Sequence, residues 1–292
     1  MNDVSIPDDR VKLVFIADLF ADDIAGGGEV NNEELMQLLV SDYHWHILKI
    51  KSTECTETVL KQIEENGYTK FIVGNFLGLS EYAKNWLKTK DYIIYEHDHK
   101  YVRNRNPAAY KDFIAPDDEL VHVDFYRNAN VVICQSKFHK DILQKNLKID
   151  HVQSVGGNLW SLIALEEMRE LSQQPKKALC SIMETSTAHK NSLGSIRACE
   201  LKKIKYELIP NISNELFLER IGTNETFIFL PKTPETLSRI VVEARMMNVK
   251  VITNNLVGAT QEDWFSLKGP QLIDFMISKR QQIVEQVYEA LQ

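Results

Sequence analysis

The sequence predicts an α/β protein built from two doubly wound domains, each a parallel sheet with helices on both faces. Short runs of β-branched and aromatic residues alternate with helical patterns, as in successive βαβ units. The strand runs are apolar almost throughout, which is typical of strands covered on both faces. The alternation stops near residue 160 and restarts after Pro175. We therefore expect a first domain over 1–174, a second over 175–268 and a separate final helix over 269–292.

The elements follow from these patterns in chain order. In the first half, apolar runs predict strands and the amphipathic runs between them predict helices, namely strands over 11–17, 44–50, 70–75, 91–97 and 130–136 and helices over 29–41, 57–66, 80–89 and 137–146. A further helix over 159–174 ends in a polar segment before Pro175. The second half repeats the pattern, with strands over 177–183, 206–210, 225–231 and 250–255 and helices over 191–203, 213–221, from about Thr236 onward, and 270–291. Such sheets bind ligands beyond the carboxyl ends of their strands, so two facing domains would hold a ligand between them.

The composition is that of an ordinary globular protein. Of 292 residues, 44% are hydrophobic and 26% are charged, and the net charge of -7 argues against a sequence-independent polyanion binder. The four cysteines are scattered without a C-x-x-C pair, which favours structural thiols in a reducing cytosol over disulfides or a zinc site. The polar N-terminus is unlike a signal peptide, and no uncharged apolar run approaches the ~18 residues that span a bilayer. We therefore expect a cytoplasmic location.

Two glutamates mark the helix expected near Thr236. Glu235 stands at its start, and Glu243 lies eight residues later, about 12 Å along a continuous helix. Unpaired N–H groups at Thr236, Leu237 and Ser238 would favour a phosphate, and carboxylates accept hydrogen bonds from vicinal diols. This helix start could therefore hold a nucleotide-sugar at a diol, a diphosphate and a second diol. Alternatively, the helix dipole alone favours Glu235, and Glu243 is solvated.

The segment over 231–260 resembles the donor-binding segment of the large family of retaining glycosyltransferases with the GT-B fold (family 4-like). That family has a Glu, seven residues and a second Glu, then a small residue, a strand and a Gly-containing turn, and the matching positions are Glu235, Glu243, Ala244, 250–253 and Gly258. The resemblance implies two facing Rossmann-like domains and a C-terminal helix that crosses back to the first domain. It also implies that Glu235 contacts the donor sugar and Glu243 the ribose, while the amides of 236–238 hold the diphosphate.

Three consecutive glycines, Gly26, Gly27 and Gly28, follow the first strand and precede a helix. Glycines let a backbone approach a ligand closely and supply amides near a helix start, although a flexible loop would use them as well. In the resembled family a Gly-rich loop ending in GG-x-E lines the cleft near the diphosphate and the acceptor. The resemblance therefore assigns Gly27 and Gly28 to the donor site.

Four polar residues, Glu96, His97, Asp98 and His99, stand at the end of the strand over 91–97. They could form a metal site, or only the start of a polar loop. The resemblance carries the family's cleft histidine onto His97, which would contact the donor sugar or the acceptor.

The next stretch, 100–111, interleaves four basic residues with two tyrosines. This pattern suits an anionic or nucleic-acid acceptor, and it equally suits a solvated loop. Asp98, Arg103 and Arg105 are therefore the candidates for the acceptor side.

The start of the second domain departs from the family pattern, which has Gly-Arg and, about five residues on, a Lys, both cations meeting the diphosphate. Lys190 stands before a helix, where the Lys is expected, but no Arg stands near Glu184 or Thr185. Lys190 would then carry most of the charge neutralisation without the bidentate fork of an Arg, unless it is an ordinary helix-start lysine. The family's x-PNG-x-D turn is also replaced, by the residues over 154–161.

The resemblance implies a hexosyl- or pentosyltransferase that moves a sugar from a nucleotide-sugar donor to an acceptor hydroxyl, with retention and without a metal ion or a cofactor. Its expected catalytic residues are His97, Lys190 and Glu235. The acceptor would be a carbohydrate, a lipid-linked precursor or modified DNA, since some virus-encoded GT-B enzymes glycosylate hydroxymethylated bases. The missing Arg leaves a second reading open, a sugar-nucleotide-binding protein without transfer activity.

Overall fold

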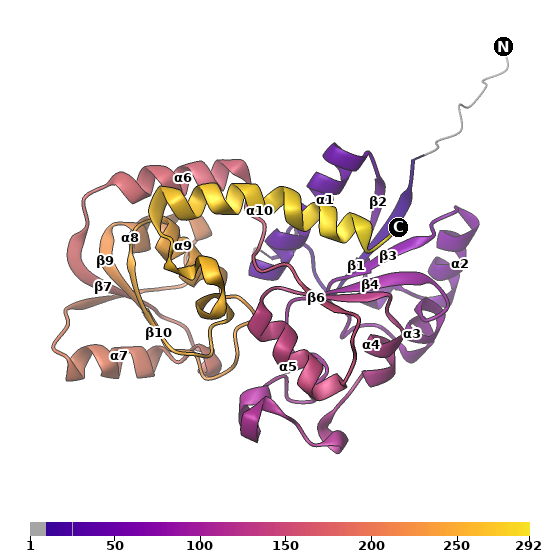
Figure 1. The fold of residues 1–292 in the computed structure, drawn as a ribbon, viewed down its shortest axis with the longest axis horizontal. Helices are drawn as coiled ribbons and strands as arrows, with labels where there is room; N and C mark the ends of the chain where they lie inside the picture. Colours follow the sequence, from indigo (N-terminus) through magenta and orange to yellow (C-terminus); the bar gives the residue numbers. More distant parts are fainter. Residues whose placement is uncertain (1–9, 25) are drawn as a thin grey trace, which may run out of the picture.

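The computed structural model describes residues 10–24 and 26–292 and contains two parallel sheets with helices packed around them (Figure 1). The first sheet has the order β2-β1-β3-β4-β5-β6, and its strands are β1 (Lys12–Ala17), β2 (His46–Lys51), β3 (Lys70–Val73), β4 (Asp91–Glu96), β5 (Val131–Cys134) and β6 (Val152–Ser154). The second sheet has the order β10-β9-β7-β8, and its strands are β7 (Lys177–Met183), β8 (Tyr206–Ile209), β9 (Asn224–Phe229) and β10 (Lys250–Thr253). The strand order reverses between β1 and β3 and between β7 and β9. Ligands bind α/β sheets at such reversal points.

The helices cover both faces of each sheet. The first domain contains α1 (Gly27–Tyr43), α2 (Glu57–Glu65), α3 (Glu81–Leu87), α4 (Val123–Asn128) and α5 (Lys137–Leu147), and after it come α6 (Leu162–Gln173), α7 (Ser192–Leu201), α8 (Asn214–Gly222), α9 (Arg239–Met246) and α10 (Gly269–Glu289). Several begin where the sequence supplies a capping hydroxyl, because the side chains of Thr56, Ser80, Ser136, Ser161 and Ser213 each accept a hydrogen bond from the N–H three residues later.

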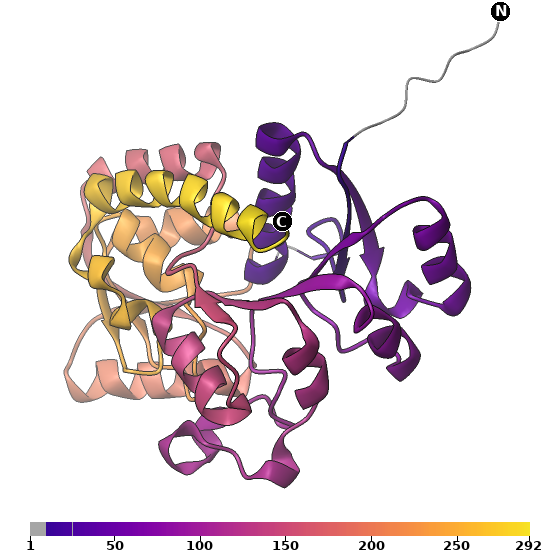
Figure 2. The ribbon, with the colours of Figure 1, turned by 45° about the vertical axis from the view of Figure 1, so that its right-hand side comes forward.

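Helix α10 joins the two domains. Its first half, with Leu272, Ile273 and Met276, packs in the core of the second domain, and its second half, with Ile283 and Val287, packs in the core of the first. Figures 1 and 2 show this yellow helix running from beside α6 to the chain's C-terminus near α1. Because one rigid helix buries apolar side chains in both cores, it fixes how the domains face each other.

The predicted elements are largely present, and three differences stand out. The prediction lacks strand β6 and helix α4, because their three and six residues are too few to show the periodicity that a sequence pattern needs. Helix α9 begins at Arg239 instead of near Thr236. Helix α6 precedes the predicted boundary at 174, but its buried residues Leu165 and Met168 pack in the second domain's core. The exact domain boundary remains a prediction.

The four cysteines are free and buried. Across residues 10–24 and 26–292, no helix combines the length and the apolar character needed to cross a bilayer.

Candidate functional site

A cavity of about 390 Å³ lies between the domains, beside the loops that follow β1, β4, β7 and β9. The first domain lines it with Gly26, Gly27, Gly28, Val30, His97, Gln135 and Asn158, and the second with Met183, Lys190, Asn214, Phe217, residues 235–240 and Glu243. The cavity thus brings together nine predicted donor-site or catalytic residues: Gly27, Gly28, His97, Lys190, Glu235, Thr236, Leu237, Ser238 and Glu243. The functional role of each is still a prediction.

Residues 234–238 form an extended turn because a neighbouring loop binds their backbone. Three hydrogen bonds tie the two segments, from the N–H of Glu235 to the carbonyl of Leu256 (2.7 Å), from the N–H of Gly258 to the carbonyl of Glu235 (2.9 Å) and from the N–H of Ala259 to the carbonyl of Leu237 (3.1 Å). Ser238 then adopts a left-handed conformation, with φ 73°, and α9 follows. The estimate of 12 Å between the two glutamates assumed a continuous helix, so it does not apply.

The N–H groups of Thr236, Leu237 and Ser238 donate to no atom in the described part of the chain. These residues line the cavity at the N-terminus of α9, where the helix dipole favours negative charge. Three bare donors at this position suit a phosphate group.

Lys190 and Glu235 meet at one point of the cavity. The Nζ of Lys190 lies 2.9 Å and 3.0 Å from the two carboxylate oxygens of Glu235. Lys190 ends a short 3-10 turn, Ala188–Lys190, that follows β7, whereas Glu235 follows β9. An ammonium group has three donors, so Lys190 can hold Glu235 and still donate to a ligand.

Glu243 is buried, contrary to the alternative of a solvated residue. It is only 5% exposed, and its Oε1 accepts a hydrogen bond of 2.8 Å from the indole of Trp160. The Nε of Arg239 lies 3.6 Å from the same oxygen. The Arg239 guanidinium stacks 4.5 Å from the Trp160 ring centre and donates to the carbonyl of Leu159.

Sequence reasoning missed Arg239, which brings a second cation to the cavity. Its pKa is lowered by burial, an effect that the Glu243 carboxylate opposes. The available signal was its position four residues before Glu243, which places both side chains on one helix face. It does not stand at the family's position after the first strand of the second domain, so that departure remains.

The glycine loop and His97 form the opposite wall. Gly26 precedes α1, and a Cβ on Gly28 would lie 3.5 Å from the His97 ring. The Nε2 of His97 is 2.6 Å from the amide oxygen of Asn32, a second residue that sequence reasoning missed. Burial lowers the pKa of His97 to about 3, so its ring is neutral near pH 7.

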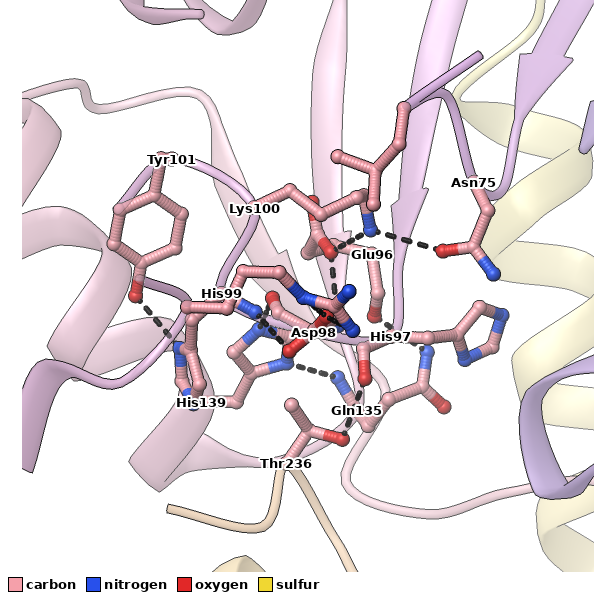
Figure 3. A network of polar contacts seen from close by, with 12 residues as sticks. Asn75, Glu96, His97, Asp98, His99, Lys100, Tyr101, Gln135, His139 and Thr236 are labelled. Atoms are coloured by element: carbon pink, nitrogen blue, oxygen red, sulfur yellow. Dashed lines mark hydrogen bonds and ion pairs between the residues drawn. The ribbon is translucent and has the colours of Figure 1, made fainter. Parts of the chain in front are cut away.

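The neighbours of His97 point in different directions, as Figure 3 shows. Glu96 turns inward, pairs with Lys100 and accepts a hydrogen bond from Tyr126. His99 is buried, with its Nδ1 2.8 Å from the hydroxyl of Tyr101. The predicted alternative of a metal site is therefore not formed at 96–99, and among the described residues no three His, Cys, Asp or Glu side chains gather in a way that could hold a metal ion.

A second cavity of about 420 Å³ adjoins the first and shares His97, Lys190, Glu235 and Thr236 with it. Its other lining residues are Asp98, Asn104, Arg105, His189, Thr233 and Pro234. Two of the three predicted acceptor-side residues, Asp98 and Arg105, therefore lie here, paired with each other. The third, Arg103, instead donates to the carbonyl of Asp118 at the surface.

No protein-family model and no curated protein sequence matches the chain. Solved structures match nearly all of it. HepE from Anabaena, in complex with UDP and glucose, is 12% identical with a TM-score of 0.54, covering 97% of this chain and 92% of that one. Sucrose-phosphate synthase from Thermosynechococcus elongatus is 12% identical with a TM-score of 0.57, covering 94% and 90%. The catalytic domain of starch synthase IV from Arabidopsis thaliana, bound to ADP and acarbose, is 10% identical with a TM-score of 0.56, covering 94% and 92%.

These neighbours are GT-B glycosyltransferases. The chain has the GT-B fold. The predicted fold class is thereby confirmed, with two facing Rossmann-like domains and α10 as the crossover helix.

Proposed function

We propose that the protein is a glycosyltransferase that moves a sugar from a nucleotide-sugar to an acceptor hydroxyl, with retention at the anomeric carbon and without a metal ion. The main support is that two carboxylates, two cations and three bare amides meet in one interdomain cavity. Carboxylates suit the hydroxyls of such a donor, and cations with amides suit its diphosphate. Neighbours of the same fold were crystallised with UDP or ADP, which agrees with such a ligand.

Different groups of the chain would bind different parts of the donor. Lys190 and the amides of 236–238 would stabilise the leaving diphosphate as its charge develops. Glu235 would accept hydrogen bonds from the sugar and Glu243 from the ribose. His97 would act as a neutral hydrogen-bonding group, because burial lowers its pKa to about 3.

The second cavity favours a carbohydrate acceptor over a lipid or DNA. Apart from Pro234, its lining side chains are polar, so it offers hydrogen bonds and little apolar surface. Part of the basic stretch over 100–111 is engaged within the protein and is not free to bind a nucleic acid. Lys100 and Tyr101 are buried, and Arg105 is paired with Asp98.

The test is release of nucleoside diphosphate from a panel of UDP-, GDP-, ADP- and dTDP-sugars, with oligosaccharides, a lipid-linked sugar and hydroxymethylated DNA as acceptors. We expect turnover with an oligosaccharide, loss of turnover in Glu243→Ala, and normal turnover in Glu225→Ala, whose exposed side chain lies outside the cavity. Proton NMR of the product would establish whether the anomeric configuration is retained.

The missing Arg after β7 favours a second candidate, a sugar-nucleotide-binding protein without transfer activity. Saturable binding of a nucleotide-sugar with no turnover on any acceptor would support it and contradict the transferase.

A further inference from the structure

Ser238 combines three features that its contacts within the protein do not explain. Its backbone is left-handed, with φ 73° and ψ 83°, a region that serine seldom occupies. The residue is only 7% exposed. Its hydroxyl is buried and has no hydrogen-bond partner among residues 10–24 and 26–292, although buried polar groups nearly always have one.

The surroundings of Ser238 indicate what the missing partner is. The residue lines the interdomain cavity of about 390 Å³, which we call the donor cavity. It lies there directly before α9, next to the bare amides of Thr236 and Leu237. Lys190 lines the same cavity, and its ammonium group keeps a donor free for an anion beside the two oxygens of Glu235. Rotation about the serine Cα–Cβ bond turns the hydroxyl among its three staggered positions, so a ligand in the cavity can select the one that donates to it.

We infer that the Ser238 hydroxyl donates a hydrogen bond to the diphosphate of the nucleotide-sugar. This contact explains why a serine holds a conformation that glycine adopts without strain. The inference rests on the proposed function and deepens it, because it adds a side-chain donor to the backbone amides. At this position the strained serine backbone lowers the stability of the protein, and the serine hydroxyl strengthens binding of the diphosphate.

The experiment measures binding and stability together in Ser238→Gly and Ser238→Ala. Calorimetry first finds which of UDP, GDP, ADP, CDP and dTDP binds the wild type most tightly, and the variants are then titrated with that diphosphate and with its nucleoside. We expect both variants to bind the diphosphate about tenfold more weakly and the nucleoside almost as before. Ser238→Gly should also raise the Tm by about 2 °C, because it removes the strained serine.

Lys148→Gly is the matched control, since Lys148 is an exposed left-handed residue, with φ 52°, at the end of α5. It should raise the Tm without changing either affinity. Unchanged diphosphate binding in both serine variants would overturn the inference and leave the proposed function standing, as would an equal loss for diphosphate and nucleoside. A wild type that binds none of the five diphosphates would overturn both.

Discussion

The charged side chains of the donor cavity occur as two pairs, Lys190 with Glu235 and Arg239 with Glu243. The four charges cancel, so a diphosphate gains net attraction only from donors that these pairs leave free. Removing either cation would leave the lining with a net negative charge, which repels a diphosphate. We therefore expect binding of a diphosphate to weaken when either cation is removed.

Arg239→Met tests this at the level of one residue. We expect binding of a nucleoside diphosphate to weaken at least about tenfold, and the free energy of unfolding to fall by about 3 kcal/mol because buried Glu243 loses its cation. Adding Glu243→Gln should restore much of the stability but not the affinity. Chemical denaturation and calorimetry measure the two effects.

Arg245→Met is the control for that experiment. Arg245 lies on the same helix and also stacks on an aromatic ring, that of Phe265, but its guanidinium binds the carbonyls of Ser266 and Leu267 outside the cavity. It should leave nucleotide binding unchanged. Equal affinity in wild type and Arg239→Met would show that the second cation is not needed.

Part of this arrangement of residues can be predicted from the sequence. The spacing of Glu235 and Glu243 and the place of Lys190 are visible in it, because each follows a predicted strand. The surroundings of Arg239 are not visible, because Leu159 and Trp160 come from a segment some 80 positions away. Nor does any local pattern reveal that Asn32 holds His97.

At the scale of the element, the decisive feature is the turn over 234–238. Local sequence favours a helix from about Thr236, but the loop over 256–259 binds the backbone of the turn and delays α9 until Arg239. Tertiary contact overrides local preference here, so no single-segment pattern could give this boundary. The unpaired amides of 236–238 therefore belong to this turn, directly before α9, and not to the first turn of the helix.

Gly258 makes that contact possible. A Cβ at this position would lie 2.4 Å from the carbonyl oxygen of Thr236, a backbone atom that cannot move aside without displacing the turn. We expect Gly258→Ala to lower the free energy of unfolding by about 1–3 kcal/mol and to weaken nucleotide binding several-fold.

Gly157→Ala is the comparison, since a Cβ there meets no atom closer than 3.6 Å. It should have little effect in either measurement. Wild-type binding by Gly258→Ala would mean that the turn does not position the amides.

At the scale of the whole molecule, α10 and Thr236 supply two of the contacts that hold the domains together. Helix α10 contributes to both cores, and Thr236 bridges the cleft, with its hydroxyl donating to the carbonyl of His97 and its carbonyl accepting from Ser136. The alternation of strands and helices predicts each domain. How the domains face each other depends on these long-range contacts. The prediction of their arrangement therefore relied on the resemblance to a known family.

Three histidines make the stability of the molecule depend on pH. Burial is the main cause that lowers the pKa of His97, His99 and His139 to about 3 each, against about 6.5 in an unfolded chain. Between these values the unfolded chain binds protons that the folded one does not, so stability falls as the pH drops from about 6.5 toward 3. Each histidine contributes up to about 1.4 kcal/mol per pH unit.

Thermal unfolding between pH 7.5 and 5 measures this dependence. We expect a steady fall in Tm below pH 6.5 and a shallower fall in His139→Gln. A Tm that stays level or rises toward pH 5 would contradict neutral buried histidines.

The most direct test of the central claim is a crystal structure of the protein with its tightest-binding nucleoside diphosphate. We predict the diphosphate against the Nζ of Lys190 and the amides of 236–238, with the ribose hydroxyls on Glu243. A nucleotide bound outside the interdomain cavity, or inside it with its phosphates away from the N-terminus of α9, would contradict the account.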